Sequence, residues 1–343
     1  MPTLYLIEQN TTLRKTSDSL RLCKKPSSLK KSAYVSQEEV LLELPCSDID
    51  QVMIFGNVQV TTQALHELLE HGIEVSLFSF SGKLLGQVTP PKTKNINLRL
   101  DQFNKYNNEQ FHLKIAKSIV TQKIYSIQKI LREFHKNHPD AFDLQDISSL
   151  PEIIERVKNA ITLDSLLGFE GSASAIYFKL FGKMIKPPWK FDGRNRRPPK
   201  DPVNAVLSFG YVVVGSELQS LLDGIGFDPY LGFYHSIHYG RPSLALDLLE
   251  EFRHSFVDRL TLNLFNRHTF TESDFYNPPG GGVYMNTEGK KKFFVQYEKM
   301  LGEYVGASSV NIQKTGIRSV FQKQIHLLAK AIQQDIPYKP WSG

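Results

Sequence analysis

PPKTKN, at residues 90–95, separates two parts of the sequence that differ in their patterning. Two prolines followed by short polar residues disfavour both helix and strand, and such a run is typical of a linker between domains. We therefore place a linker at residues 90–96, between one domain at residues 1–89 and a second at residues 97–343. A length of 343 residues is also long for a single hydrophobic core, which favours two domains.

Before the linker, the pattern predicts a β-rich domain with one helix. Short runs rich in β-branched, aromatic and leucine residues alternate with polar turns, as they do in strands. TTQALHELLEH, at residues 61–71, opens with threonines suited to helix capping and ends before Gly72, a common C-cap residue. The predicted strands lie at residues 3–9, 12–22, 40–44, 52–56 and 75–80.

After the linker, amphipathic periodicity predicts a larger, all-α domain. The expected fold class is therefore α+β, with the β-rich domain first and the helical domain second. Three loops interrupt the helices: a Pro- and Arg-rich loop at 186–202, a Gly- and aromatic-rich turn at 224–242, and NPPGGG at 277–282. The predicted helical segments lie at residues 98–137, 151–186, 202–223, 243–264 and 290–304.

Composition favours an intracellular protein that binds an acidic partner. No membrane span or secretory signal is evident, and Cys23 and Cys46 are too few for a disulfide framework, so we expect the cytoplasm. The net charge is +6, and it is unevenly spread. Residues 1–88 carry 8 basic and 10 acidic side chains, whereas the remaining residues carry 33 and 25. A positive field on the second domain fits a phosphate-rich ligand such as nucleic acid.

Glu170 stands on the predicted apolar face of a helix within residues 162–181. A carboxylate among apolar side chains is costly unless it is paired or bound to a cation. A buried ion pair, or a position at the edge of the face that reaches solvent, would explain Glu170 without any catalytic site. We trace the apolar face through Leu163, Leu167, Ser174, Phe178 and Phe181.

A second polar group follows the Gly-rich turn, which delivers His235 just before a predicted helix with Asp247 and Glu250. Residues three apart share a helix face, so both carboxylates can point toward one cation that His235 completes. A His with two or three carboxylates suits Mg²⁺ or Mn²⁺ better than a closed zinc site. The alternative is that Asp247, Glu250, His254 and Asp258 form the solvated face of an amphipathic helix.

Basic and aromatic residues interleave between residues 183 and 200. Lysine and arginine can neutralise phosphates while Trp189 or Phe191 stacks on an unpaired base, which fits a strand end or a splayed duplex. A solvated basic loop is the alternative. The candidate nucleic-acid contacts are Lys186, Trp189, Arg194, Arg196, Arg197, Lys200 and Arg241.

Five segments, in this order along the chain, resemble the motifs of a known family. They are SLLGFEGSASAIYF (165–178), PPKDPVNAVLSFGY (198–211), IGFDPYLGFYH (225–235), GRPSLALDLLEEFR (240–253) and GGGVYMNTEGKKKFF (280–294). Over nearly its whole length the sequence resembles the CRISPR-associated integrase of spacer acquisition, the first of the Cas proteins.

The resemblance implies roles for the acidic residues and the histidine. Glu170, His235 and Glu250 match the family's ligands of Mg²⁺ or Mn²⁺, and Asp247 matches an accompanying acidic residue of the same catalytic site. Family members often carry Asp at the last position, so Glu250 adds a methylene that alters the reach of the ligand but not its type. By the same resemblance, residues 1–89 mediate dimerisation and residues 97–343 hold the catalytic, DNA-binding domain.

The implied reaction is DNA integration. The 3′-hydroxyl of a short DNA fragment, the spacer, attacks a phosphodiester at the edge of a CRISPR repeat, and the same site cleaves single-stranded or branched DNA. The implied partners are DNA (fragment ends, branched DNA and the CRISPR leader–repeat), a second copy of the chain, and the small second Cas protein. No membrane partner is expected, and the compartment is the prokaryotic cytoplasm.

Two other functions remain open from the sequence. A general metal-dependent nuclease of DNA repair would use the same residues with water as the nucleophile. A DNA-binding architectural subunit with an inactive site would keep the basic surface and lose the chemistry.

Overall fold

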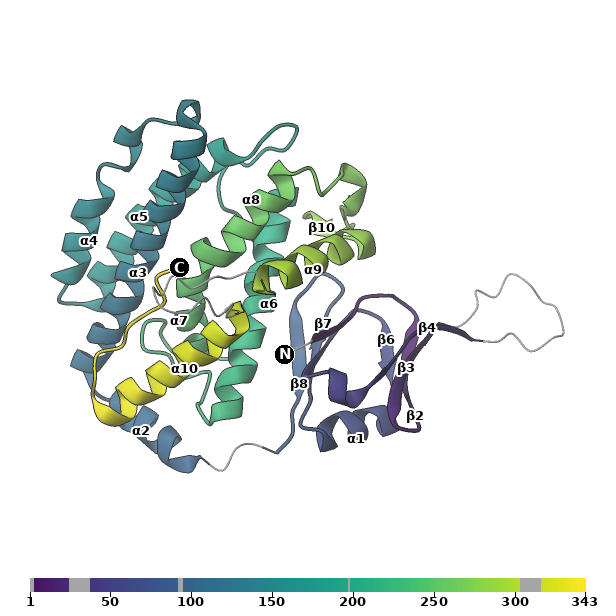
Figure 1. Ribbon diagram of the computed structural model, residues 1–343. Coiled ribbons are helices and arrows are strands. Elements are labelled where there is room, and N and C mark those ends of the chain that lie inside the picture. Colours follow the sequence, from purple (N-terminus) through teal and green to yellow (C-terminus); the bar gives the residue numbers. More distant parts are fainter. Residues whose placement is uncertain (1–2, 25–37, 92–94, 197, 303–315) are drawn as a thin grey trace, which may run out of the picture. The chain divides into compact units, whose positions relative to one another are not determined.

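The chain divides into two compact units, Met1–Lys92 and Thr93–Gly343 (Figure 1). The computed structural model describes residues 3–24, 38–91, 95–196, 198–302 and 316–343. The first unit is rich in strands, and the second is mostly helical. The predicted α+β class is thereby confirmed.

Two four-stranded sheets form the described part of the first unit. The elements are β1 Thr3–Leu6, β2 Thr11–Thr16, β3 Ser19–Lys24, β4 Glu39–Pro45, β5 Gln51–Phe55, β6 Val58–Val60, α1 Thr62–Glu70, β7 Glu74–Phe78 and β8 Leu84–Val88. One sheet has the order β1-β5-β7-β8, with β8 antiparallel to an otherwise parallel set. The other has the order β4-β3-β2-β6, built around the β2–β3 hairpin. The sequence pattern missed β6 and β8.

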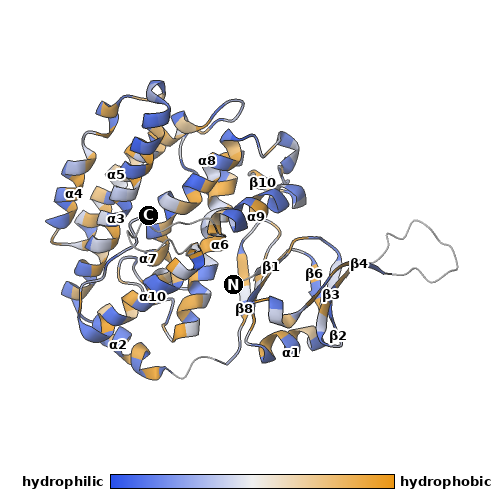
Figure 2. Ribbon diagram, in the orientation of Figure 1, coloured by the Kyte–Doolittle hydropathy of each residue, from blue (hydrophilic) through white to orange (hydrophobic). Residues whose placement is uncertain are grey.

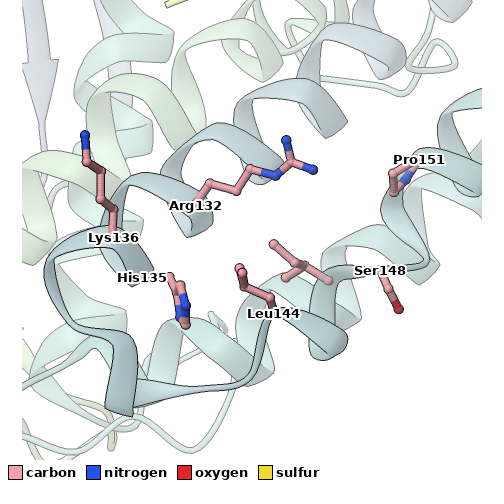
Figure 3. Close-up of a pocket in the computed structure, with 7 residues that line it drawn as sticks. Arg132, His135, Lys136, Leu144, Ser148 and Pro151 are labelled. Atoms are coloured by element: carbon pink, nitrogen blue, oxygen red, sulfur yellow. The ribbon is translucent and has the colours of Figure 1, made fainter.

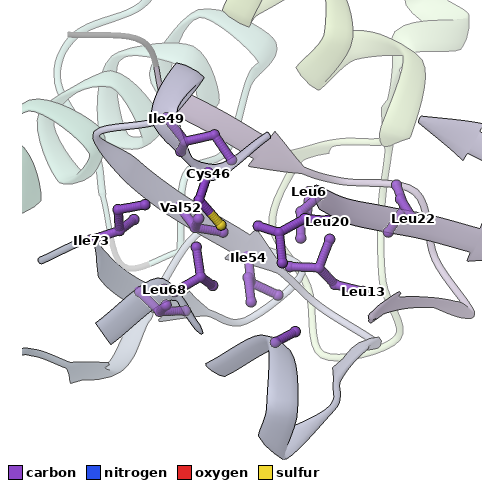
Figure 4. Close-up of a cluster of buried hydrophobic side chains, with 12 residues drawn as sticks. Leu6, Leu13, Leu20, Leu22, Cys46, Ile49, Val52, Ile54, Leu68 and Ile73 are labelled. Carbon is purple, nitrogen blue, oxygen red and sulfur yellow. The ribbon is translucent and has the colours of Figure 1, made fainter. Parts of the chain in front are cut away.

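The core of the first unit lies where strands of both sheets and α1 bring apolar side chains together. Figure 4 shows Leu13 and Leu20 of the β2–β3 hairpin beside Val52 and Ile54 of β5. Leu68 joins them from α1, whose N-terminus is capped as predicted, with the Thr61 hydroxyl accepting the Ala64 N–H at 3.3 Å. Figure 2 shows apolar and polar residues alternating along these elements.

Nine described helices dominate the second unit. They are α2 Ile96–Tyr106, α3 Glu109–Asn137, α4 Leu150–Lys158, α5 Leu163–Met184, α6 Pro202–Ile225, α7 Ser243–Phe252, α8 Arg259–Asn266, α9 Thr287–Gly302 and α10 Ile317–Gln334. Short 3₁₀ turns lie in this unit at Pro139–Ala141, Leu144–Ile147 and Glu272–Asp274, and β9 Phe275–Tyr276 pairs with β10 Tyr284–Met285. A further 3₁₀ turn, Cys46–Asp48, belongs to the first unit. The sequence pattern did not predict α10.

Three predicted helices are divided in the structure. The segment predicted at 98–137 breaks between α2 and α3, where Asn108 caps the second helix by accepting the Phe111 N–H at 3.0 Å. The segment predicted at 151–186 divides into α4 and α5. The segment predicted at 243–264 is interrupted by a π-helical segment, Arg253–Asp258, which joins α7 to α8.

The long helix α6 is a core element of the second unit. Its length and composition would suffice to cross a membrane, but 67% of its most apolar window is buried within the fold. Such burial is what a core helix has. Asp201 caps its N-terminus by accepting the Asn204 N–H at 2.8 Å, and Gly226 ends it with a positive φ.

The face on which Glu170 stands differs from the predicted one. Leu167 is 47% exposed, so the predicted apolar face that includes it is not the face of α5 that is buried in the core. The buried stripe of α5 is shifted around the helix, and Glu170 lies on it between Leu166 and Ala173, one turn from each. The buried residues of α5 are Leu166, Ala173, Tyr177, Leu180, Phe181 and Met184.

Candidate active site

Three helices of the second unit each place one charged side chain at the same point. Lys123 of α3 pairs with Oε1 of Glu170 of α5, and its Nζ lies 2.7 Å from Oε2 of Glu250 of α7. The side chains of Lys123 and Glu250 are only 5% and 3% exposed, whereas Glu170 is 19% exposed. The cluster is therefore buried on the α3 and α7 sides and reaches solvent beside Glu170.

The helix α7 and its π-helical continuation are not a solvated face. Asp247, Glu250, His254 and Asp258 are each at most 2% exposed. The alternative that this polar stripe faces water is therefore wrong. Each of these groups needs a partner, because an unpaired buried charge costs several kcal/mol.

Asp247 holds the loop that carries His235. Its Oδ2 accepts the backbone N–H groups of Phe233 and Tyr234 at 2.5 and 2.9 Å, and its Oδ1 accepts that of His235 at 2.8 Å. The same Oδ1 lies 2.8 Å from Nδ1 of His235. Gly232 permits this approach, since a Cβ there would lie 2.9 Å from Oδ2 of Asp247.

The contacts of Asp247 alter the expected geometry of the site. We expected Asp247 and Glu250 to face one cation together, but the oxygens of Asp247 are occupied by the loop. Because Nδ1 of His235 faces Asp247, its other nitrogen, Nε2, is turned toward Glu250, 3.8 Å from Oε1. A carboxylate behind an imidazole in this way fixes the ring and its tautomer.

The surroundings keep both glutamates ionised. Burial alone would raise the pKa of Glu250, but the charges of Arg253, Lys123 and His235 lower it to about 2. Burial likewise acts to raise the pKa of Glu170, yet Lys123 brings it below the ordinary value, helped by a hydrogen bond from Ser174 at 2.8 Å. Ionised carboxylates are what a cation ligand requires.

The donor set fits a hard divalent cation. Both carboxylates contact the Lys123 ammonium, and Nε2 of His235 lies 3.8 Å from Oε1 of Glu250. Carboxylate oxygens with one imidazole nitrogen are donors that suit Mg²⁺ or Mn²⁺. Oε2 of Glu250 is buried and lies 2.7 Å from the Lys123 ammonium. In this conformation a cationic side chain is therefore the partner of the carboxylate oxygens that a metal ion would use.

The π-helical segment adds Arg253, which the sequence pattern did not single out, and gives partners to Asp258, which was expected on the polar stripe. Its first residue, Arg253, lies 3.2 Å from Oε1 of Glu250, and its guanidinium covers the ring of Tyr211 at 4.9 Å. Its last residue, Asp258, accepts hydrogen bonds from Tyr177 and Tyr211 at 2.8 and 2.5 Å. These contacts fix the π turn, a feature often found beside functional sites.

The basic loop divides into buried and exposed residues. Arg194 is turned inward, where its guanidinium donates to Asn204 at 2.8 Å and to Ser208 at 3.0 Å. Trp189 packs edge-on against Phe265, with ring centroids 5.1 Å apart. Phe191 is 7% exposed, so its predicted stacking on a base is not available in this conformation.

The remaining candidate DNA contacts lie on the surface or near it. Lys186, Arg196 and Lys200 are exposed. The guanidinium of Arg241 donates a hydrogen bond to the Ser236 carbonyl, next to His235 in the chain. Its Nε also donates to the Ser243 hydroxyl at 3.4 Å. Arg197 lies outside the described residues.

Another candidate metal group lies in the first unit and contains none of the predicted ligands. Cys46, Glu67 and His71 have ligand atoms within 4.8 Å of one another. Glu67 is already paired with Lys15, and Nδ1 of His71 lies 2.9 Å from the Glu67 carbonyl. Burial also raises the pKa of the Cys46 thiol. These contacts oppose metal binding there.

A hollow of about 560 Å³ lies at the C-terminal end of α3. Figure 3 shows Arg132, His135 and Lys136 on α3, with Leu144 and Ser148 on the segment that follows. No carboxylate lines it, so it lacks the donors of the cluster described above.

Comparison with known proteins identifies the family. The model of the family "CRISPR associated protein Cas1" matches residues 4–299. The chain belongs to the Cas1 family. It is 39% identical over 261 residues to CRISPR-associated endonuclease Cas1 1 of Thermodesulfovibrio yellowstonii, covering 75% of this chain and 81% of that protein. Its relatives support a role in spacer integration and a nuclease activity.

Two solved structures share the fold over nearly the whole chain. A Cas1 protein from Thermotoga maritima has a TM-score of 0.77 at 26% identity, covering 96% of this chain and 97% of that one. A Cas6-RT-Cas1–Cas2 complex has a TM-score of 0.80 at 25% identity, covering 99% of this chain and 36% of the matched chain. The chain therefore shares the Cas1 fold along nearly its whole length.

Proposed function

We propose that this chain is a metal-dependent DNA integrase that inserts short DNA fragments into a CRISPR array. The observation that carries the proposal is that Glu170 and Glu250 share the Lys123 ammonium, and that Nε2 of His235 lies 3.8 Å from Oε1 of Glu250. Membership of the Cas1 family supplies the substrate, since the named relatives are CRISPR-associated endonucleases.

Each residue of the site has a distinct task in this proposal. Glu170, Glu250 and His235 hold the divalent ion, Mg²⁺ or Mn²⁺, and Asp247 positions His235 from behind. The ion, when bound, polarises a phosphate oxygen and favours deprotonation of the attacking 3′-hydroxyl. Arg253 keeps Glu250 ionised and in place. The exposed cations Lys186, Arg196 and Lys200 bind DNA phosphates.

The proposal includes the partners and the compartment. The chain acts as a homodimer formed through residues 1–89, together with the small second Cas protein and with DNA. A solved complex that contains Cas1 and Cas2 supports the second partner. The site of action is the prokaryotic cytoplasm, where the CRISPR array lies.

Strand transfer tests the proposal directly. A labelled DNA fragment with a free 3′-hydroxyl is incubated with a repeat-containing plasmid, Mn²⁺ and the second Cas protein. Wild type, Glu170→Gln and the exposed control Glu152→Gln are compared, with DNA binding measured alongside. We expect the wild type and the control to join DNA, and Glu170→Gln to bind DNA without joining it.

The products distinguish the alternatives. Shortened strands without joined products would indicate a general nuclease that uses water. Strand transfer by Glu170→Gln at the wild-type rate would show that the cluster is not the active site. DNA binding without any metal-dependent reaction, in the presence of the partner, would indicate an architectural subunit.

A further inference from the structure

A buried lysine lies at the centre of the proposed metal site. Lys123 lies midway along α3, 5% exposed, with its ammonium in contact with one oxygen of Glu170 and one of Glu250. Lysine is among the residues least often buried, and its desolvation is tolerated only when opposite charges compensate it. Two glutamates from two other helices provide that compensation.

The charges of the cluster balance without any added ion. Glu170 and Glu250 carry two negative charges, and Lys123 and Arg253 carry two positive charges within ion-pair distance of them. Without Lys123, the carboxylates of α5 and α7 would face a poorly solvated space beside α3 with no ammonium between them, where like charges repel strongly. The ammonium therefore holds α3, α5 and α7 together at this point.

A divalent ion would require the same oxygens. Oε1 of Glu170 and Oε2 of Glu250, which face the ammonium, belong to the ligands assigned above to the metal. A divalent ion within a few ångströms of the Lys123 ammonium would repel it in a medium of low dielectric constant. The four-carbon stem lets the ammonium move, and the partly exposed Glu170 marks the side on which the cluster opens.

We propose that Lys123 is a resident cation of the active site, a positioning residue that metal displaces. It keeps the two glutamates in place before metal binds, and it weakens metal affinity because it must leave them. This inference rests on the proposed function, because it assumes that Glu170 and Glu250 are metal ligands. It adds a residue that controls the metal concentration at which the site binds its ion.

Metal binding to matched variants tests the inference. Mn²⁺ is titrated calorimetrically into wild type, Lys123→Met and Lys114→Met, an exposed lysine on the same helix. We expect Lys123→Met to bind Mn²⁺ about tenfold more tightly or better, because no ammonium competes. In EDTA, its Tm falls below that of the wild type, and Mn²⁺ raises it by more than it raises the wild-type value.

A labelling measurement on the wild type covers the case in which Lys123→Met does not fold. Reductive methylation followed by peptide mass spectrometry reports the access of each lysine to reagent. Lys123 should be protected in EDTA and react faster with Mg²⁺ present, whereas Lys114 reacts equally in both. Protection of Lys123 that is unchanged or stronger with Mg²⁺ contradicts displacement.

Glu170→Gln separates the two ways in which the argument can fail. If Glu170→Gln abolishes Mn²⁺ binding but Lys123→Met binds no more tightly than wild type, the metal site stands and the competing role of Lys123 is wrong. If Glu170→Gln leaves Mn²⁺ binding unchanged, the metal lies elsewhere and the proposed function loses its site.

Discussion

Asp247→Asn should destabilise the second unit and misplace His235. The carboxylate accepts two backbone N–H groups at Oδ2, and at Oδ1 it contacts the N–H and ring nitrogen of His235. An asparagine keeps one acceptor oxygen and turns an NH₂ group toward the donors that the other oxygen served. Two of the four contacts are therefore lost.

The size of the effect follows from these contacts. A hydrogen bond to a charged group contributes about 1.5–3 kcal/mol, so losing two costs about 3–6 kcal/mol. A domain of this size loses about 2–4 °C of Tm for each kcal/mol, which gives a fall of at least about 6 °C. Asp247 holds the ring of His235, a proposed metal ligand, in its orientation. Strand transfer should therefore fall about 10- to 100-fold at a temperature where the variant is folded.

Thermal unfolding and strand transfer measured on the same samples check this prediction. Asp164→Asn is the matched control, because Asp164 is exposed in the first turn of α5. An exposed carboxylate in a first helical turn contributes at most about 1 kcal/mol through the helix dipole. The control should change little in either measurement. A Tm of Asp247→Asn within about 2 °C of wild type, with joining intact, would refute the view that this carboxylate anchors the loop.

Two further predictions concern a buried carboxylate and the basic loop. Burial raises the pKa of Glu251 to about 7 despite hydrogen bonds from Tyr338 and Trp341. The folded chain then keeps a proton that the unfolded chain loses above about pH 4.5, so the free energy of unfolding falls from there to about pH 7. Glu251→Gln removes this loss of stability, so the Tm of the variant minus the Tm of wild type should increase between about pH 5 and pH 8. If that difference in Tm stays constant over this range, the hydrogen bonds keep Glu251 ionised and the prediction is wrong. Arg196→Gln should reduce the salt slope of DNA binding by about 1 without changing Tm, whereas Arg194→Gln should lower Tm; equal salt slopes for wild type and Arg196→Gln would remove Arg196 from the DNA contacts.

Local sequence pattern predicted the elements that depend on local chemistry. The capping of α1 by Thr61 and the start of α7 after the Gly-rich turn are both read from neighbouring residues. Glu170 was identifiable because a carboxylate on an apolar face requires a partner, and Glu250 because it shares a helix face with Asp247. Assignment of these residues to a metal site depended on the resemblance, and it stays a prediction.

The partner of these carboxylates could not be predicted from local pattern. Lys123 is one of several lysines on α3. A lysine on an amphipathic helix normally faces solvent. Lys123 is buried because α5 and α7 pack against α3. The glutamates that pair with it on these two helices are distant in the sequence. Arg194 shows the reverse case, since a basic loop predicted a DNA contact and the fold turned this arginine toward Asn204.

The π-helical segment explains why the charges after Glu250 are not aligned as a regular helix would align them. In an uninterrupted α-helix, Asp247, Glu250, His254 and Asp258 would share one face, which is why the sequence allowed a solvated stripe. The wider turn at Arg253–Asp258 separates them into two groups. Glu250 faces Lys123 and His235, whereas Asp258 faces Tyr177, Tyr211 and His254. This helical segment can therefore bury four ionisable side chains, because the His235 loop satisfies Asp247, α3 pairs with Glu250, and α5 and α6 donate to Asp258, which in turn pairs with His254.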